Sequence, residues 1–138
     1  MAKIINITEA VAIALHSAIL ITNNNCKPVN VNYIAEATGS SKFHIAKVLQ
    51  KLVRDGLLGS HRGPNGGFYL VSKPENITLL QIFESIEGKI KVSHCPIHKE
   101  TCPFSSCVFG DQIAEMTENF KNYLESNTLY DYINNSNN

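Results

Sequence analysis

The sequence contains no tryptophan and carries no net charge, because 12 lysines and arginines balance 12 aspartates and glutamates. Only 17% of the residues are charged and 43% are hydrophobic. This composition is typical of a folded globular domain and excludes long disordered or collagen-like segments. The longest apolar stretch, residues 11–21, is interrupted by His16 and Ser17 and is too short to cross a membrane. The first residues also lack the pattern of a secretion signal, so we expect a cytoplasmic protein.

Motifs of the common enzyme classes are missing as well. The chain has no Cys-X-X-Cys pair, no nucleotide-binding fingerprint, no Ser, His and Asp order typical of hydrolases and no recognisable pair of catalytic carboxylates. Its 138 residues fit one compact domain, or a small domain with an appended oligomerisation segment. A chain of this size can bury a core without disulfides or a structural metal. We therefore expect a binding protein and not an enzyme.

The zero net charge hides an asymmetry between the two halves of the chain. Residues 1–73 hold eight Lys and Arg residues against three acidic ones, for a net charge of +5. Residues 74–138 hold four against nine, for a net charge of −5. A basic first half is typical of a surface that binds a polyanion such as DNA. Chance clustering of solvated charges explains the same numbers, and composition alone does not decide between the two interpretations.

Two short helices are predicted at the start of the chain. Thr8 and Glu9 are typical of a helix start, and apolar residues follow at helical spacing until the run of asparagines at Asn23. Asn30 is a favourable N-cap for a second helix, and this helix is predicted to end at Gly39.

A third helix follows after a turn of a few residues. It begins at Ser41 and ends at Asp55, and its apolar residues repeat every three or four positions: Ile45, Val48, Leu49, Leu52 and Val53. Two helices joined by a short turn with glycine form a helix-turn-helix. Two strand-like runs, residues 57–61 and 68–71, then flank a segment rich in glycine and proline that predicts a hairpin. This order is that of a winged helix-turn-helix.

The outward face of the third helix predicts a DNA-binding surface. A helical wheel centred on Ile45 puts Phe43, Lys47, Gln50, Lys51 and Arg54 on the far side. Residues near the start of the helix are placed to meet base edges in a major groove, while lysine and arginine can neutralise phosphates. The alternative is an ordinary solvated face of an amphipathic helix.

The hairpin adds one arginine at its tip. Arg62 can enter a minor groove narrowed by A·T sequence, and the glycines around it let the backbone approach a phosphate closely. An ordinary surface loop is the alternative. The predicted DNA-binding residues are Ser41, Lys42, Phe43, His44, Lys47, Lys51, Arg62, Gly63 and Gly66.

The second half of the chain combines two helices with a cysteine-containing loop. A helix is predicted from Thr78 to Glu87, another from about Val108 to Ser126, and a last turn over residues 129–133. The segment between the two helices lacks periodicity and carries Cys95, Cys102 and Cys107.

The three thiols leave several chemistries open. They can converge on one soft metal ion or cluster if the loop wraps around it. His94 or His98 can complete a Cys3His zinc site. The thiols can also act as a metal-free redox sensor, or can simply be buried. We interpret Cys26 as structural, and His16 as a core or interface residue and not a ligand.

These motifs together resemble the Rrf-type family of bacterial transcriptional regulators, with its IscR-, NsrR- and CymR-like members. The resemblance covers nearly the whole chain and is carried by Ile34-Ala35-Glu36, Lys47-Val48-Leu49-Gln50-Lys51-Leu52, Gly56-Leu57-Leu58, Ser60-His61-Arg62-Gly63-Pro64-Asn65-Gly66-Gly67-Phe68-Tyr69-Leu70, Ile77-Thr78-Leu79 and Ile86-Glu87-Gly88. It implies a mainly α fold with a small β wing: a winged helix-turn-helix that dimerises through a long C-terminal helix. It further implies a DNA-binding regulator, usually a repressor, that reads a roughly palindromic operator. Arg62 is then expected in the minor groove, and the start of the third helix, from Ser41, in the major groove.

The resemblance also implies a cofactor. Iron–sulfur members of the family carry three cysteines in this region and take a fourth ligand from elsewhere. In some, this ligand is a histidine three residues after the third cysteine, where this chain has Gly110. In others it is an acidic residue directly after a threonine in the first helix of the partner subunit, which Glu9 matches. The implied ligands are Cys95, Cys102, Cys107 and Glu9, with zinc as the alternative metal.

One family feature is absent from the first helix. Members often have Tyr-Ala-Leu-Arg after the threonine and acidic pair, whereas this chain has Ala10-Val11-Ala12-Ile13 and therefore lacks that arginine's phosphate contact. We expect residues 1–73 to bind DNA, residues 74–107 to form a linking helix and a sensor loop, and residues 108–138 to dimerise. The expected signal is redox state, nitric oxide or iron–sulfur status. The alternative is a winged-helix regulator without a cluster that uses thiols, zinc or a partner protein.

Overall fold

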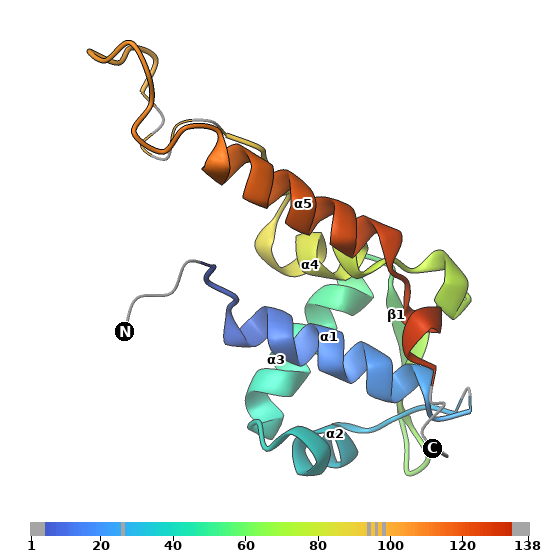
Figure 1. Ribbon diagram of the computed structural model, residues 1–138. Coiled ribbons are helices and arrows are strands. Elements are labelled where there is room, and N and C mark those ends of the chain that lie inside the picture. Colours follow the sequence, from blue (N-terminus) through green and yellow to red (C-terminus); the bar gives the residue numbers. More distant parts are fainter. Residues whose placement is uncertain (1–4, 26, 94, 96, 98, 134–138) are drawn as a thin grey trace.

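The computed structural model describes residues 5–25, 27–93, 95, 97 and 99–133 and is mostly helical (Figure 1). Its elements in chain order are α1 (Glu9–Thr22), α2 (Val31–Thr38), α3 (Lys42–Arg54), β1 (Leu58–His61), β2 (Gly67–Leu70), the short 3-10 helix η1 (Pro74–Asn76), α4 (Leu79–Glu87), α5 (Gln112–Ser126) and the 3-10 turn η2 (Leu129–Tyr132). This order confirms the predicted winged helix-turn-helix.

The starts of α1, α2 and α3 are fixed by side-chain caps that the sequence predicted. The side chains of Thr8, Asn30 and Ser41 each accept a hydrogen bond from the backbone N–H three residues further on. Thr78 does the same for α4 and completes a capping box with Gln81. Each such cap satisfies a backbone donor that the first turn leaves unpaired, and contributes about 1 kcal/mol.

One hydrophobic core holds the helices together. The face of α3 formed by Ile45, Val48, Leu49 and Leu52 is buried against α1, α2 and α4. Leu124 from α5 and Leu129 from η2 join the same core. The C-terminal elements are further tied to the middle of the chain because Leu129 N–H donates to the carbonyl of Ile77, and Leu79 N–H to that of Asn127.

The two strands form an antiparallel hairpin, the wing. Leu58 pairs with Leu70 at its base and His61 with Gly67 near its tip. The wing is also linked to the segment before α2, because the backbones of Val29 and Phe68 exchange two hydrogen bonds of 2.8 and 2.9 Å. The wing therefore has a fixed position relative to the helix-turn-helix.

Two details differ from the prediction. α5 begins at Gln112 and not at about Val108, because residues 108–111 form turns and Gly110 has a left-handed φ of +59°. His16 is exposed and bonds through Nδ1 to the carbonyl of Ala12, so it is not a core residue, and its place at an interface stays a prediction. The apolar residues around it in sequence take up the buried face of α1.

Figure 1 shows the molecule as two ends joined by the core. α2, the start of α3 and the tip of the wing lie at the lower end, and the loop between α4 and α5 extends from the upper end. Among the helices that the structure describes, none has the length and apolar character needed to cross a membrane.

Candidate nucleic-acid interface and cysteine loop

The outward face of α3 is a straight row of exposed side chains. Phe43, Lys47, Gln50 and Arg54 are all exposed and recur at intervals of four, three and four residues. At 3.6 residues per turn these positions lie almost directly above one another along the helix. We call these four residues the α3 row. Lys51 lies beside it and is half-buried. The row combines an aromatic ring, two cations and an amide, which are groups that contact bases and phosphates in DNA.

The first turn of α3 is fixed at its start and touches α1. Ser41 is exposed, and its Oγ accepts a hydrogen bond from the N–H of His44 at 3.1 Å. The His44 ring lies beside the first turn of α1, where its Nδ1 is 3.7 Å from Oε1 of Glu9. The sequence predicted His44 at the DNA and Glu9 at a cluster. It did not reveal their contact, because the spacing of residues within one helix carries no information about a second helix.

An aromatic pair stacks on the wing near its tip. The rings of His61 and Tyr69 stack with centroids 4.6 Å apart. The Tyr69 ring lies so close to Gly59 that a Cβ there would come within 2.4 Å of it and would have to displace the ring. The stack fixes the strand directly before Arg62, which is itself exposed at the tip.

The glycines of the wing have structural roles. A Cβ at Gly66 would lie 2.3 Å from the carbonyl oxygen of His61, and a Cβ at Gly67 would lie 2.5 Å from the backbone of Val29. Gly63 has a φ of +109° and open space around it. Gly66 and Gly67 therefore allow the tight wing turn and its approach to α2, whereas Gly63 leaves the tip accessible beside Arg62.

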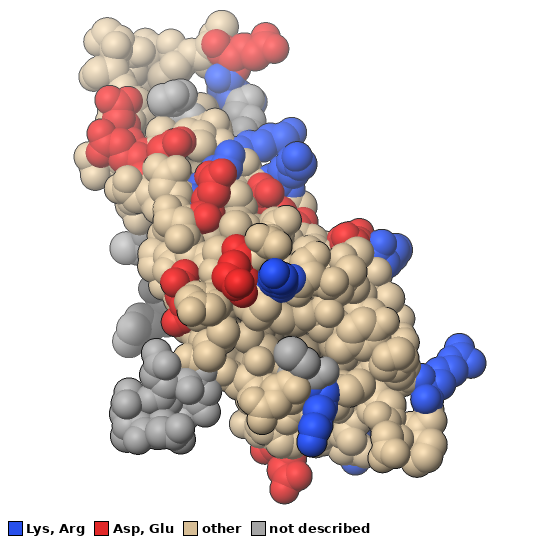
Figure 2. All heavy atoms as spheres, turned by 90° about the vertical axis from the view of Figure 1, so that its right-hand side faces the viewer, with Lys and Arg blue, Asp and Glu red and all other residues tan. Residues whose placement is uncertain are grey.

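The charge asymmetry of the sequence is also an asymmetry in space. On the face that Figure 2 shows, acidic side chains gather over the upper part of the molecule, at the height of α4, α5 and the loop. The lower end carries the first half of α3 and the tip of the wing (Figure 1), and the exposed cations Lys42, Lys47 and Arg62 belong to these segments. The end that carries the candidate DNA-binding residues is thus the basic one.

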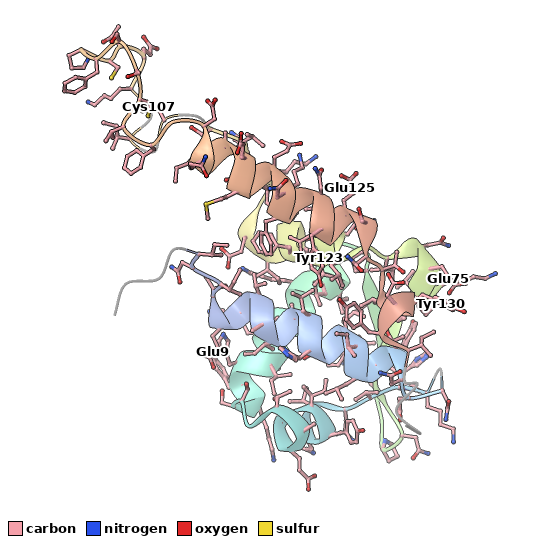
Figure 3. All side chains as sticks on the ribbon, viewed as in Figure 1. Glu9, Glu75, Cys107, Tyr123, Glu125 and Tyr130 are labelled. Carbon is pink, nitrogen blue, oxygen red and sulfur yellow. The ribbon has the colours of Figure 1, made fainter. Side chains whose placement is uncertain are left out.

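The cysteine loop has almost no packing of its own. Cys95 is half-buried, whereas Cys102 and Cys107 are exposed, as is every residue from 99 to 112. Among the described residues no three His, Cys, Asp or Glu side chains come together as a metal site. Figure 3 shows Glu9 at the start of α1 and Cys107 in the projecting loop, well apart within one chain. Cys26, His94 and His98 lie outside the described residues.

The donor types nevertheless suit a soft metal centre. Thiolates are the usual ligands of iron–sulfur clusters, and the exposure of Cys102 and Cys107 leaves both sulfurs accessible. Since one chain does not bring these thiols and Glu9 together, a shared site requires a contribution from a second subunit.

Two adjoining apolar grooves lie between α1, α4 and α5. One is lined by Ile5, Ile7, Ile113 and Met116, and both share Ile7, Phe83 and Phe120. Phe83 and Phe120 meet edge to face with ring centroids 6.0 Å apart. Ile5 and Ile7 are 49% and 42% exposed. The hydrogen bond between the hydroxyls of Tyr123 and Tyr132 raises the pKa of Tyr132 at the end of this surface. The apolar pattern of α5 was evident in the sequence, but these grooves were not.

Comparisons with known proteins agree with this architecture. Residues 7–135 match the model of the Rrf2 family, described as an iron-dependent transcriptional regulator. The HTH-type transcriptional regulator IscR of Yersinia pestis is 25% identical over 130 residues, which cover 94% of this chain and 74% of that protein. CymR, the global cysteine regulator of B. subtilis, superposes with a TM-score of 0.78 at 24% identity, covering 93% of this chain and 95% of that one.

A second solved structure, IscR of T. potens, superposes with a TM-score of 0.72 at 20% identity and covers 92% of this chain and 85% of that one. These superpositions confirm the winged-helix fold. The family match extends over nearly the whole chain, and the relatives are transcriptional regulators and not enzymes. The chain therefore belongs to the Rrf2 family of DNA-binding transcriptional regulators.

Proposed function

We propose that the chain reads double-stranded DNA with α3 in a major groove and Arg62 of the wing in the adjacent minor groove. The observation that carries this proposal is the exposed α3 row, whose first residues lie at the same end of the molecule as the wing tip. The first turn of α3, with Ser41, Lys42 and Phe43, meets base edges, and Lys47 and Lys51 reach bases or phosphates. Gly63 and Gly66 shape the wing tip so that its backbone passes close to the phosphates.

The same proposal includes a homodimer. The apolar grooves beside α5 expose aliphatic and aromatic side chains, and a second copy of α5 would cover them. Two copies related by a two-fold axis present two α3 helices, so the matching operator is roughly palindromic. In this arrangement residues 1–73 bind DNA, residues 74–107 link and sense, and residues 108–138 dimerise, in the cytoplasm where the DNA lies.

The cysteine loop is the proposed sensor. Cys95, Cys102 and Cys107 of one subunit, with Glu9 at the start of α1 in the other, would hold an iron–sulfur cluster. When bound, the cluster supplies a group that responds to redox state, nitric oxide or iron supply. Glu9 is available for this role because its side chain is 71% exposed. Its carboxylate also lies beside His44, so a change at Glu9 reaches the first turn of the DNA-reading helix directly.

Repression is the proposed outcome, since a dimer bound across an operator blocks access to it. A second candidate is a regulator without a cluster, in which the exposed thiols of Cys102 and Cys107 respond to oxidants, zinc or a partner protein. The exposure of both thiols favours this candidate as much as it favours a cluster, so the experiments must separate the two.

The DNA-binding proposal is tested with a gel shift on random-sequence duplex at low salt, followed by titration at increasing salt. Lys47→Ala and Arg62→Ala should each weaken binding about tenfold, because each removes one base or phosphate contact. Loss of a phosphate contact should also reduce the slope of log K against log salt by about one. Lys99→Ala is the matched control, since Lys99 is an equally exposed cation in the cysteine loop. Equal affinity of the unmodified protein and all three variants for DNA would refute the proposed surface.

The cluster proposal is tested by anaerobic purification, absorption spectroscopy and analysis of iron and sulfide. Cys102→Ala should abolish the visible absorption that the unmodified protein shows, and Ser105→Ala, in the same exposed loop, should retain it. Glu9→Gln should weaken retention of the cluster. A colourless protein that binds zinc, or one that holds no metal but loses DNA binding on oxidation, would favour the second candidate.

The dimer proposal is tested by sedimentation or light scattering. Met116→Asp places a charge in the groove beside α5 and should yield a monomer. Glu125→Ala, an exposed change further along α5, should leave the dimer intact. A monomeric unmodified protein would refute the shared sensor site.

A further inference from the structure

We infer that Phe43 recognises a thymine methyl group in each half of the operator and so determines part of the sequence that this chain prefers. This inference rests on the proposed binding of α3 in a major groove, and it assigns a specific base to one residue of that surface.

Phe43 is unusual among the apolar residues of the DNA-binding region. Its side chain is 82% exposed, although it lies in a well-formed helix whose other aliphatic residues are buried or half-buried. A phenylalanine buries about 150 to 250 Å² when it is packed, so a ring left in water does not gain the favourable free energy of burying that surface. The ring does not stabilise the fold of this chain. Its exposure is explained if it packs against another molecule.

The position of Phe43 determines which part of DNA it meets. It is the second residue of α3, and side chains on a helix lean toward its N-terminus. The ring therefore lies at the end of α3 that enters the groove first. Lys47 and Gln50 follow it in the α3 row, so an aromatic ring, a cation and an amide face successive positions along the groove.

The chemistry of the major groove then selects thymine. Base edges there display hydrogen-bond donors and acceptors, and the exception is the methyl group on C5 of thymine. A phenylalanine ring makes no hydrogen bonds, and covering a donor or an acceptor without replacing its water is unfavourable. The ring therefore favours a base pair that places a methyl group under it and disfavours G·C pairs at that position.

The test begins with selection of preferred sites from a random duplex pool by the purified full-length protein. Each thymine of the selected site is then replaced by deoxyuridine, which removes only the methyl group and preserves base pairing. At one thymine per half-site the replacement should weaken binding about fourfold, the effect of one buried methyl group. Replacements at the other thymines should have smaller effects.

Protein variants connect that methyl group to Phe43. Phe43→Ala should bind the thymine and deoxyuridine duplexes with equal affinity, whereas Phe43→Leu should retain part of the difference. Lys47→Ala is the matched control in the same row: it should bind both duplexes more weakly but keep their fourfold ratio. Because Phe43 is exposed, circular dichroism and thermal unfolding of its variants should match those of the unmodified protein.

The possible failures are distinguishable. If no sequence is selected and random DNA is not bound, the proposed function itself is wrong and this inference falls with it. If a site is selected but no thymine methyl group affects binding, DNA reading stands and the inference about Phe43 is wrong. The inference is also wrong if Phe43→Ala still distinguishes thymine from deoxyuridine.

Discussion

The end of the molecule proposed to bind DNA, residues 29–70, differs from the cysteine loop in how many of its contacts lie within the chain itself. We call it the DNA-binding end. In the segment from Val29 to Leu70, the helices are capped, the buried face of α3 is complete and the wing is joined to the rest by backbone hydrogen bonds. In the loop, every residue from 99 to 112 is exposed, including the large side chains of Phe104 and Val108. One end is therefore preorganised, whereas the described part of the loop makes few contacts within this chain.

This difference explains why a regulator can be built in this way. A DNA-reading surface must present base-contacting groups in a fixed arrangement, because a misplaced side chain loses its contact. The sensor proposed for the loop would need two conformations of similar free energy, and a segment without a core is suited to that. The two are connected through α4, which packs against α1, α3 and α5.

The largest effect should come from removing a core side chain at the DNA-binding end. Leu49 is fully buried in α3, and Leu49→Ala should lower the free energy of unfolding by about 2 to 5 kcal/mol. Phe104→Ala removes more atoms, but from a residue that is 74% exposed, and should change it by less than about 0.5 kcal/mol. Denaturant unfolding of both proteins, at one protein concentration and without metal, gives the comparison. Similar losses would mean that the loop has a core after all.

A second pair of variants replaces glycine by alanine, once in the wing and once in the cysteine loop. Gly67→Ala forces a Cβ to within 2.5 Å of the Val29 backbone, and should cost about 1 to 3 kcal/mol by displacing the wing. Gly110→Ala meets no atom within 4 Å, and the remaining cost of its left-handed φ is about 1 kcal/mol. A gel shift separates the two further, since only Gly67→Ala should weaken DNA binding. A Gly67→Ala protein with full affinity would show that the wing position does not matter for DNA.

The contrast between the two ends also determines what the sequence could predict. The caps at Asn30 and Ser41 and the period of α3 are local signals, and the structure confirms the elements they predict. The predicted start of α5 is too early because the apolar pattern runs through Gly110, whose left-handed backbone belongs to a turn.

Contacts between distant elements could not be predicted from local patterns. The pairing of Val29 with Phe68 and the approach of Glu9 to His44 join residues far apart in sequence, and no spacing rule reveals them. The same holds for the grooves beside α5. The ligand set of Cys95, Cys102, Cys107 and Glu9 remains a prediction, because it depends on a second subunit.

A smaller effect is expected at the start of α3. Ser41→Ala removes the cap of α3 and should lower the free energy of unfolding by about 1 kcal/mol. Ser41→Asn preserves a capping side chain and should restore that stability. Measuring DNA affinity for both variants then separates the two roles of Ser41. If Ser41 also contacts DNA, Ser41→Asn will be stable but weak in binding. If its role is only to cap the helix, Ser41→Asn will bind normally.

The smallest effect is expected where the DNA-binding end meets α4. Ser85 Oγ donates a 2.5 Å hydrogen bond to Oδ2 of Asp55, the residue that ends α3, while Oε2 of the neighbouring Glu84 accepts one from the N–H of Ile90. The last turn of α4 therefore holds both the end of α3 and the segment that leads into the loop. A double-mutant cycle with Ser85→Ala and Asp55→Ala should give a coupling of about 0.5 to 1 kcal/mol in unfolding, because water replaces most of an exposed hydrogen bond. A coupling near zero would mean that this contact does not join the two ends, and that the hydrophobic contacts of α4 with α1 and α3 connect them instead.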